Sequence, residues 1–377
     1  MTTPATAVGA GRREPPLLEQ WYRDHRSPRV LDLSSSGVPA LTVAEALELV
    51  GLGWEDLGAV RLDDSESLGA LPLRQAVAQA WGIGDPDRVL ATQGSNESIF
   101  LVMHTLLAPG DEVVSVSPVY HAYQTALQAL HCDVRWWRLP AEAGFQPDLD
   151  RLDALVRPTT KAIIVNFPHN PTGVSVSPAE QATIIDISQR AGAYLLWDNA
   201  FAELTYDSPP LTDPTRLYDR ALSIGTLSKA YGLPGLRIGW CLGPPELLAR
   251  TIPLRDSTTL FLSPLTEAIA TAAVGRRAAL RERYACQLAG NRRRLLEWAA
   301  ASPDVADCPA PAGGVTAFVR FAGIASTIGP CRDLARAGVL LLPGAAFGHP
   351  DRVRLGFGGP AADLLTGLGK VTEFLAA

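Results

Sequence analysis

The stretch TLSKAYGLPGLRIGW, residues 226–240, decides the fold class because it places a lysine between two apolar segments. Lys229 follows one segment that is typical of a β-strand and precedes another. A lysine among apolar neighbours can lose its proton and form a Schiff base with an aldehyde. Thr226 and Arg237 could bind a phosphate on the same ligand. Taken alone, Lys229 could equally be a surface lysine after a strand, so its role depends on the rest of the chain.

Short apolar runs alternate with helical patterns around this stretch, which is typical of βαβ units and a mostly parallel sheet. Strands are predicted at residues 88–92, 112–116, 162–166, 194–197, 221–225 and 237–241. Helices are predicted at residues 73–81, 97–107, 123–130, 178–190 and, as one long segment, 263–300. The sequence therefore predicts an α/β fold with a mostly parallel central sheet.

Polar side chains follow four of these strands, where an open parallel sheet forms its ligand crevice. They are Ser95 with Asn96, Asn170, Asp198, and Thr226 with Lys229. The N–H groups that open the helix at Ser95 would suit a phosphate. Asp198 could instead cap a helix, as aspartate often does, but the shared location favours a ligand role. Together these groups fit an aldehyde cofactor with a phosphate, a pyridine nitrogen and a phenolic oxygen, which is pyridoxal 5′-phosphate (PLP).

Composition narrows the remaining function classes. The net charge of -6 argues against a nucleic-acid-binding surface, and the arginine-rich segment 274–294 is interpreted as a helix with one buried face. No apolar run approaches the roughly 20 residues of a membrane span. The six histidines and five scattered cysteines show no metal-ligand spacing. We expect no metal site, no disulfide framework and a cytoplasmic location.

Length and pattern predict more than one domain. Residues 1–16 are interpreted as a loose N-terminal tail, and residues 46–279 as a large cofactor-binding domain. Residues 17–45 and 280–377 are expected to form a smaller α/β domain.

Four motifs resemble the class I/II aminotransferases, which have the PLP-dependent transferase (aspartate aminotransferase-like) fold. They are NFPHNPTG (166–173), the Ser-Lys of TLSK followed by GLRIG (235–239), QGSNESIF (93–100) and RVRLGF (352–357). The resemblance implies that Lys229 is the Schiff-base lysine, Asp198 the pyridinium partner and Asn170 the ligand of the ring oxygen. It also implies that Tyr120 stacks on the ring, and that Ser95, Asn96, Thr226 and Arg237 hold the phosphate. Arg354 would bind the substrate α-carboxylate beside the Gly37 backbone. A homodimer with shared active sites is implied as well.

Two positions depart from that family's pattern. The family usually has a tyrosine three residues after the aspartate, donating to the ring oxygen, and Phe201 stands there. It also usually has a tyrosine shortly before Gly69 that reaches the neighbouring subunit's phosphate. Here residues 61–69 read RLDDSESLG, with acids instead of a phenol.

A closer resemblance within the family is to PLP-dependent cyclases of antibiotic biosynthesis. It rests on SSSGV (34–38), NFPHNPTG (166–173), LLWD-x-AF (195–201), GTLSKAYGLPGLR-x-GW (225–240), NRRR-x-LEWAAAS (291–302) and GGVTAF (313–318). It implies that 3-hydroxy-L-arginine loses water and that its guanidine adds intramolecularly. A guanidinium favours a carboxylate partner, so Asp63, Asp64 or Glu66 is expected near it, with Asp64 favoured.

Other interpretations remain open from the sequence. An ordinary aminotransferase would use the same cofactor ligands. A PLP-binding transcription regulator would carry a DNA-binding domain before the fold, where only about thirty residues precede it here. Lone residues have simpler readings as well: Tyr120 could belong to the core, Arg354 could be a solvated strand charge, and His121 is expected to be part of the pocket wall.

Overall fold

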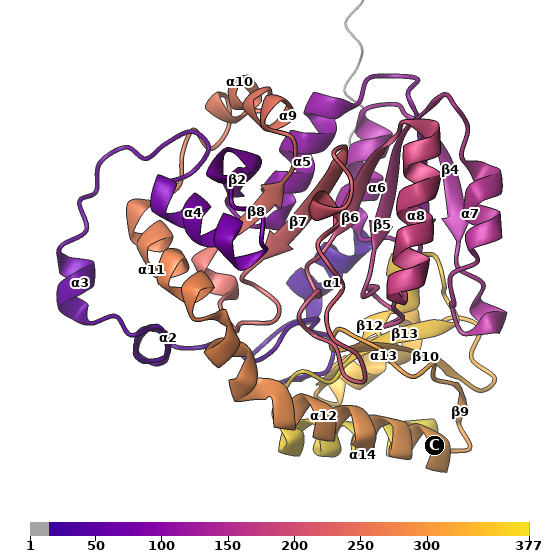
Figure 1. The fold of residues 1–377 in the computed structure, drawn as a ribbon. Helices are drawn as coiled ribbons and strands as arrows, with labels where there is room; N and C mark the ends of the chain where they lie inside the picture. The colour runs from indigo at the N-terminus through magenta and orange to yellow at the C-terminus, as the bar shows by residue number, and fades with distance from the viewer. Residues whose placement is uncertain (1–14, 377) are drawn as a thin grey trace, which may run out of the picture.

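The computed structural model describes residues 15–376, and a seven-stranded sheet forms its centre (Figure 1). The strand order is β2-β8-β7-β6-β5-β3-β4. Strand β8 is antiparallel to both of its neighbours, β2 and β7, and the other adjacent pairs are parallel. The predicted α/β class with a mostly parallel sheet is confirmed. The first fourteen residues of the predicted tail lie outside the described residues.

The strands of this sheet are β2 (Val89–Thr92), β3 (Glu112–Ser117), β4 (Asp133–Arg138), β5 (Thr160–Asn166), β6 (Tyr194–Asp198), β7 (Ala221–Thr226) and β8 (Gly239–Leu242). All six predicted strands are present, with ends shifted by at most two residues. β4 was missed because it is an edge strand whose Asp and Arg residues obscure the apolar pattern. Its Trp137 is nevertheless fully buried, and the indole donates to the carbonyl of Asp148.

The helices before α11 are α1 (Leu17–His25), α2 (Val43–Val50), α3 (Trp54–Gly58), α4 (Leu71–Ala80), α5 (Ser95–Leu106), α6 (His121–Ala129), α7 (Leu149–Leu155), α8 (Pro178–Ala191), α9 (Pro245–Ala249) and α10 (Ile252–Asp256). Short 3-10 turns span Pro86–Arg88, Ala141–Ala143, Pro214–Arg216, Pro234–Leu236 and Gly344–Phe347. Helix α8 starts at a capping box between Ser177 and Glu180, with proline at its first position. This combination satisfies otherwise unpaired N–H groups at the helix start.

The long helix predicted over residues 263–300 is two helices, α11 (Pro264–Gly275) and α12 (Arg277–Ala301). The single-helix prediction is wrong at Arg276, whose φ of -109° and ψ of 18° leave the helical region directly after Gly275. Glycine loses the most conformational freedom in a helix interior, so it favours a helix end. Helix α12 buries Leu280, Tyr284 and Leu288 along one side, as the spacing predicted.

The last part of the chain forms a four-stranded antiparallel sheet in the order β12-β13-β10-β9. Its strands are β9 (Val305–Asp307), β10 (Thr316–Phe321), β12 (Leu342–Pro343) and β13 (Arg352–Gly356), and helices α13 (Ile328–Arg336) and α14 (Ala361–Leu375) accompany them. A separate parallel pair joins β1 (Leu31–Asp32) to β11 (Val339–Leu340). The N-terminal segment therefore pairs with the C-terminal part, while the expected domain bounds stay a prediction.

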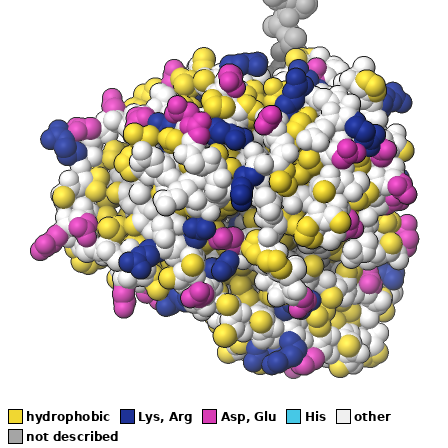
Figure 2. Space-filling model, viewed as in Figure 1, with side chains coloured by type: hydrophobic (Ala, Val, Ile, Leu, Met, Phe, Trp, Pro, Cys, Tyr) yellow, Lys and Arg dark blue, Asp and Glu magenta, His cyan; other side chains and the backbone are white. Residues whose placement is uncertain are grey.

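Helix α3 lies on a long segment that stands away from the body of the molecule (Figure 1). Large apolar side chains on and beside this arm are exposed, including Trp54 at 66% and Leu62 at 79%. On the face seen in Figure 2, Lys and Arg side chains are interspersed with Asp and Glu. Within residues 15–376, no helix combines the length and the apolar character that a membrane crossing requires.

Candidate functional site

A cavity lies at the carboxyl ends of β5, β6 and β7, where the sequence placed its polar groups. The residues that line it include nine of those predicted as cofactor or substrate ligands from side chains: Ser95, Asn96, Tyr120, Asn170, Asp198, Phe201, Lys229, Arg237 and Arg354. Gly37 lines it as well. Two predicted ligands, Thr226 and Asp64, are not in its wall. His121 is in the wall, where the sequence placed it.

Lys229 follows β7 and donates from Nζ to Oγ of Ser36 across 2.9 Å. Burial lowers its pKa to about 8, and the nearby positive charge of Arg354 acts in the same direction. Its hydrogen-bond partner is a neutral hydroxyl, which does little to hold the ammonium form. A substantial fraction of Lys229 is therefore a neutral amine near pH 8, the form that attacks an aldehyde. Ser36 belongs to the SSSGV motif, but its contact with Lys229 was not predicted.

Asp198 ends β6, where its Oδ1 accepts a hydrogen bond from the Ala200 N–H at 3.0 Å. Burial raises the pKa of this carboxyl to about 6, against the opposing effects of Ala200, Tyr123 and Lys229. The Tyr123 hydroxyl is fully buried and, within residues 15–376, makes no hydrogen bond of ordinary geometry. A buried carboxylate needs hydrogen-bond donors or a positive charge nearby. A protonated ring nitrogen beside Asp198 would supply both, in addition to the Ala200 N–H.

Phe201, three residues after Asp198, also lines the cavity and is 2% exposed. Tyr120 is half-buried at the start of α6, and burial raises the pKa of its hydroxyl to about 12. Tyr120 is an aromatic surface suited to a flat ring, and Phe201 offers no hydroxyl to such a ring. Asn170 uses Oδ1 to accept from Arg354, which leaves its amide N–H groups available as donors.

A phosphate-sized cradle forms at the N-terminus of α5. Gly94 has a φ of +78°, and a side chain there would collide with the guanidinium of Arg237. A Cβ at Gly239 would likewise collide with the backbone at Ser95. The two glycines thus let an arginine and a strand approach the helix start, where the N–H groups and the helix dipole favour an anion.

Thr226, which was predicted to hold the phosphate, is not among the residues that line the cavity. It is buried, and its hydroxyl donates to Oγ of Ser228 at 3.0 Å and accepts from the Ser228 N–H. Ser228 lines the cavity instead, with its Oγ 3.4 Å from Nη1 of Arg237. Ser228 was not among the predicted ligands, although it stands directly before Lys229. Thr226 therefore contacts a serine that lines the cavity, from a position behind the cavity wall.

Arg354 is a buried guanidinium whose hydrogen-bond acceptors are all uncharged. It donates from Nη1 to Asn170 Oδ1 at 3.1 Å and from Nη2 to Tyr22 Oη and the Ser34 carbonyl, both at 2.8 Å. Its Nε has no acceptor among residues 15–376, and no carboxylate of this part of the chain pairs with it. A buried charge without a counter-ion is costly, so this site suits a carboxylate ligand. Tyr22 was not predicted, because its role depends on a contact 332 residues away.

Asp64 is exposed on the arm between α3 and α4. Neither of its alternatives is in the cavity wall either: Asp63 pairs with Arg61 at 2.7 Å, and Glu66 pairs with Arg74 at 2.9 Å. Within a single copy of the chain, the carboxylate predicted to bind the substrate guanidinium therefore does not lie beside the other site residues. The prediction of Asp64 depends on a second copy.

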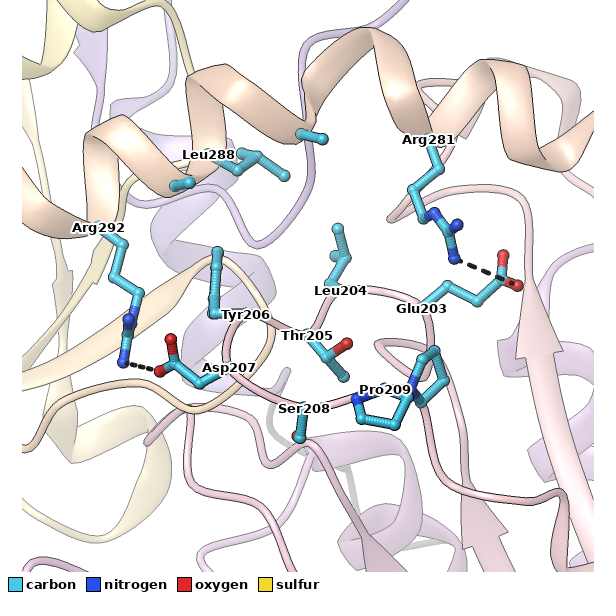
Figure 3. A pocket seen from close by; sticks show the side chains of 13 residues that line it. Glu203, Leu204, Thr205, Tyr206, Asp207, Ser208, Pro209, Arg281, Leu288 and Arg292 are labelled. Carbon is cyan, nitrogen blue, oxygen red and sulfur yellow. Dashed lines mark ion pairs between the residues drawn. The ribbon is translucent and has the colours of Figure 1, made fainter.

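A second hollow lies between α12 and residues 203–210 (Figure 3). Its arginines face acids of the same hollow: Arg281 faces Glu203 at 3.9 Å, and Arg292 pairs with Asp207 at 2.9 Å. Glu203 also accepts a hydrogen bond from Tyr231, two residues after Lys229, at 2.5 Å. The arginines and acids of this hollow therefore neutralise one another. The hollow is linked to the loop that follows Lys229 through the hydrogen bond between Tyr231 and Glu203. Within residues 15–376, no cluster of His, Cys, Asp and Glu could hold a metal ion.

Comparisons with known proteins give consistent results. The family described as aminotransferase class I and II matches residues 65–371. Capreomycidine synthase of Streptomyces vinaceus is 45% identical over 373 residues, covering 98% of this chain and 96% of that protein. Arginine–pyruvate transaminase AruH of Pseudomonas aeruginosa is 31% identical over 283 residues, covering 72% and 70%.

Solved structures resemble the chain over nearly its whole length. The PLP-dependent cyclase OrfR, in a crystal structure in complex with Au, superposes with a TM-score of 0.93 at 41% identity, covering 98% of this chain and 99% of that one. A PLP-dependent aminotransferase from Streptococcus suis gives a TM-score of 0.91 at 29% identity, covering 97% and 98%.

Proposed function

Because the chain belongs to the class I and II aminotransferase family, we propose that it is a PLP-dependent cyclase that converts (3S)-3-hydroxy-L-arginine to capreomycidine. The observation that carries this proposal is the 45% identity to capreomycidine synthase over 98% of the chain. The cavity supports it, since it combines a lysine, a buried aspartate and a buried arginine in one wall. The activity would serve antibiotic biosynthesis of the streptothricin or viomycin kind.

The cavity has groups for each part of PLP. The phosphate would lie against the α5 N-terminus, held by Ser95, Asn96, Ser228 and Arg237, with Thr226 behind Ser228. The ring would stack on Tyr120, with Phe201 near the ring oxygen. Bound there, PLP supplies an electron-accepting ring and an aldehyde that captures the substrate amine.

With PLP bound, separate residues of the chain would bind the substrate and transfer its protons. Arg354 holds the substrate α-carboxylate, with the Gly37 backbone beside it. Asp198, as a carboxylate, keeps a proton on the ring nitrogen, and Asn170 donates to the ring oxygen. Lys229 removes the proton from the substrate Cα, and the Cβ hydroxyl takes up a proton and departs as water. A guanidino nitrogen then adds to Cβ and closes a six-membered ring, and the proton that this nitrogen loses is returned to Cα through Lys229.

This sequence is redox-neutral, because the product equals the substrate minus one water. Holding the guanidine close to Cβ makes ring closure intramolecular, which can be worth several kcal/mol. The test is a product assay by mass spectrometry with 3-hydroxyarginine and the PLP-loaded enzyme. A cyclic product 18 Da below the substrate is expected, the mass of the water lost, with PLP unchanged.

An ordinary aminotransferase is the second candidate, and the 31% identity to an arginine–pyruvate transaminase favours it specifically. It would give pyridoxamine phosphate and a keto acid in the same assay. Phe201, in place of the tyrosine usual in aminotransferases, favours the cyclase.

We also propose a homodimer in which the exposed arm of one copy covers the site of the other. The exposed Trp54 and Leu62 support such a contact, because large apolar side chains gathered on a surface mark interaction sites. Asp64 would then reach the substrate from the second copy. Light scattering after gel filtration tests the dimer. The five cysteines are free thiols, as in a reducing compartment, which supports a cytoplasmic location.

A further inference from the structure

Within residues 15–376, three carboxylates line the cavity, and they differ in what they already bind. Asp198 is placed for the ring nitrogen. Asp32 is used by the fold, because its Oδ1 accepts from the N–H groups of Ser34 and Ser35 and its Oδ2 lies 3.2 Å from Arg26. The third carboxylate, Glu19, has none of these backbone contacts.

Glu19 is directed into the cavity by α1. Its Oε1 lies 3.0 Å from Nε2 of His121, and its Oε2 accepts no hydrogen bond from any other described residue. The Glu19 side chain is 39% exposed, against 14% for His121, so the acid is the more accessible member of the pair. The hydrogen bond to His121 lowers the pKa of Glu19, and the charge of Glu19 affects the pKa values of Lys229 and Tyr120. Glu19 is therefore an ionised carboxylate in the cavity lining, with one oxygen that accepts no hydrogen bond from the described residues.

Helix α1 fixes Glu19 relative to Arg354. Tyr22 lies three residues after Glu19, which places both side chains on one side of the helix. The Tyr22 hydroxyl accepts from Arg354 at 2.8 Å and donates to the Ser34 carbonyl at 3.0 Å. Trp21 is 4% exposed and donates to the Leu341 carbonyl at 2.9 Å, which holds the helix against the C-terminal part.

The cavity consequently presents at Arg354 a guanidinium without a counter-ion and at Glu19 an available carboxylate. Helix α1 carries Glu19 and contacts Arg354 through Tyr22. An amino acid with a cationic side chain carries the complementary pair, a carboxylate at one end and a cation at the other. Asp64 offers no such placement within the same chain.

We propose that Glu19 binds the guanidinium of the substrate, with His121 orienting the carboxylate, and that it sets the preference for a cationic side chain. The inference deepens the proposed function and rests on it for the identity of the substrate. It differs from the Asp64 prediction in needing no second copy of the chain.

The experiment compares two amino acids on PLP-loaded enzymes. Dissociation constants of L-arginine and of L-norleucine, whose side chain is apolar, are measured from the absorbance change of the bound cofactor. In Glu19→Gln we expect L-arginine to bind roughly tenfold to hundredfold more weakly, the loss of a charge-assisted hydrogen bond. L-norleucine should change by no more than about twofold, because it never used the carboxylate. Glu19→Asp should keep part of the preference for L-arginine.

Glu373→Gln, an exposed position on α14, is the matched control and should behave as the wild type. Unchanged L-arginine binding in Glu19→Gln would overturn the proposal. So would an equal loss for both amino acids, which would indicate a structural role. Selective loss in Asp64→Asn alone would assign the guanidinium to the second copy.

The two proposals fail in different ways. If the wild type forms no cyclic product from 3-hydroxyarginine while Glu19→Gln selectively loses L-arginine, the cyclase proposal fails and the role of Glu19 stands. If the wild type forms the cyclic product and Glu19→Gln still binds L-arginine normally, the role of Glu19 alone is wrong.

Discussion

Lys229 and Ser36 lie 193 residues apart in sequence, and a 2.9 Å hydrogen bond from the lysine Nζ to the serine Oγ joins them. The contact ties the loop after β7 to the N-terminal segment that follows β1. It also means that the hydrogen-bond partner of the Lys229 amine carries no charge. The partner is a neutral hydroxyl, so burial and the charge of Arg354 outweigh the opposing charges of Asp198 and Glu19 and lower the pKa of the amine.

Replacing Ser36 by aspartate should therefore slow the reaction of Lys229 with PLP. The folded pKa of about 8 lies below the usual lysine value, so the neutral amine forms as pH rises through 8. A carboxylate beside Nζ stabilises the ammonium and moves this midpoint to higher pH. At pH 7 we expect roughly a tenfold slower attachment, one pKa unit, measured by stopped-flow absorbance of apoenzyme mixed with PLP. Ser36→Ala is the control and should keep the midpoint at or below 8. Equal midpoints in all three proteins would contradict the argument.

Phe201→Tyr should lower the pH at which the absorbance of bound PLP changes. The new hydroxyl can donate to the ring oxygen and stabilise its negative charge, which the phenylalanine does not. One hydrogen bond of about 1 kcal/mol corresponds to a shift of somewhat less than one pH unit. A spectral titration of the loaded enzymes measures it, with Phe201→Leu as a variant that adds no donor. Identical midpoints for wild type and Phe201→Tyr would sink this prediction.

Arg354→Lys should weaken binding of the substrate carboxylate. The arginine guanidinium is planar and contacts Asn170, Tyr22 and Ser34. Lysine would put a single ammonium group in its place. We expect KM for the amino acid to rise roughly tenfold to hundredfold, from the loss of about 1.5–3 kcal/mol. Binding of the corresponding amine without a carboxylate should be nearly unchanged. If both ligands weakened equally, Arg354 would have a structural role only.

Tyr231→Phe should destabilise the loop that follows Lys229. It removes the hydrogen bond to Glu203, whose side chain is 15% exposed and lies 3.4 Å from Arg277. Arg281 faces the same carboxylate (Figure 3). The free energy of unfolding should fall by about 1–2 kcal/mol, measured by urea denaturation of the loaded enzyme. Tyr194→Phe, on β6 beneath Arg220, keeps its ring packing and should change stability by less than about 0.5 kcal/mol. If Tyr231→Phe lowered the free energy of unfolding less than Tyr194→Phe does, the hydrogen bond to Glu203 would not stabilise the loop.

The sequence predicted the parts of the fold in which local pattern and buried environment agree. The apolar runs before Asp198 and Thr226 are fully buried strands, so period and composition were sufficient. The prediction missed strand β4 because an edge strand tolerates charged residues. It also missed the break between α11 and α12, because one residue, Arg276, interrupts an otherwise helical pattern.

The site was predictable where its residues follow a strand in the same segment, as Lys229 and Asp198 do. It was not predictable where a contact crosses the molecule. Tyr22, Ser36 and Glu19 come from the N-terminal segment, and nothing local to them points to Arg354, Lys229 or the cavity. The distinction between Thr226 and Ser228 depends on which hydroxyl faces the cavity, and sequence adjacency does not specify that.

The docking of α1 also has a consequence for synthesis of the chain. Trp21 and Tyr22 emerge from the ribosome early, but their partners Leu341 and Arg354 are translated 320 and 332 residues later. At roughly 5–20 residues per second, the first helix waits on the order of 15–60 s for the surface it covers. The contact between Tyr22 and Arg354 can therefore form only when translation is almost finished, after the strands of the central sheet have been synthesised.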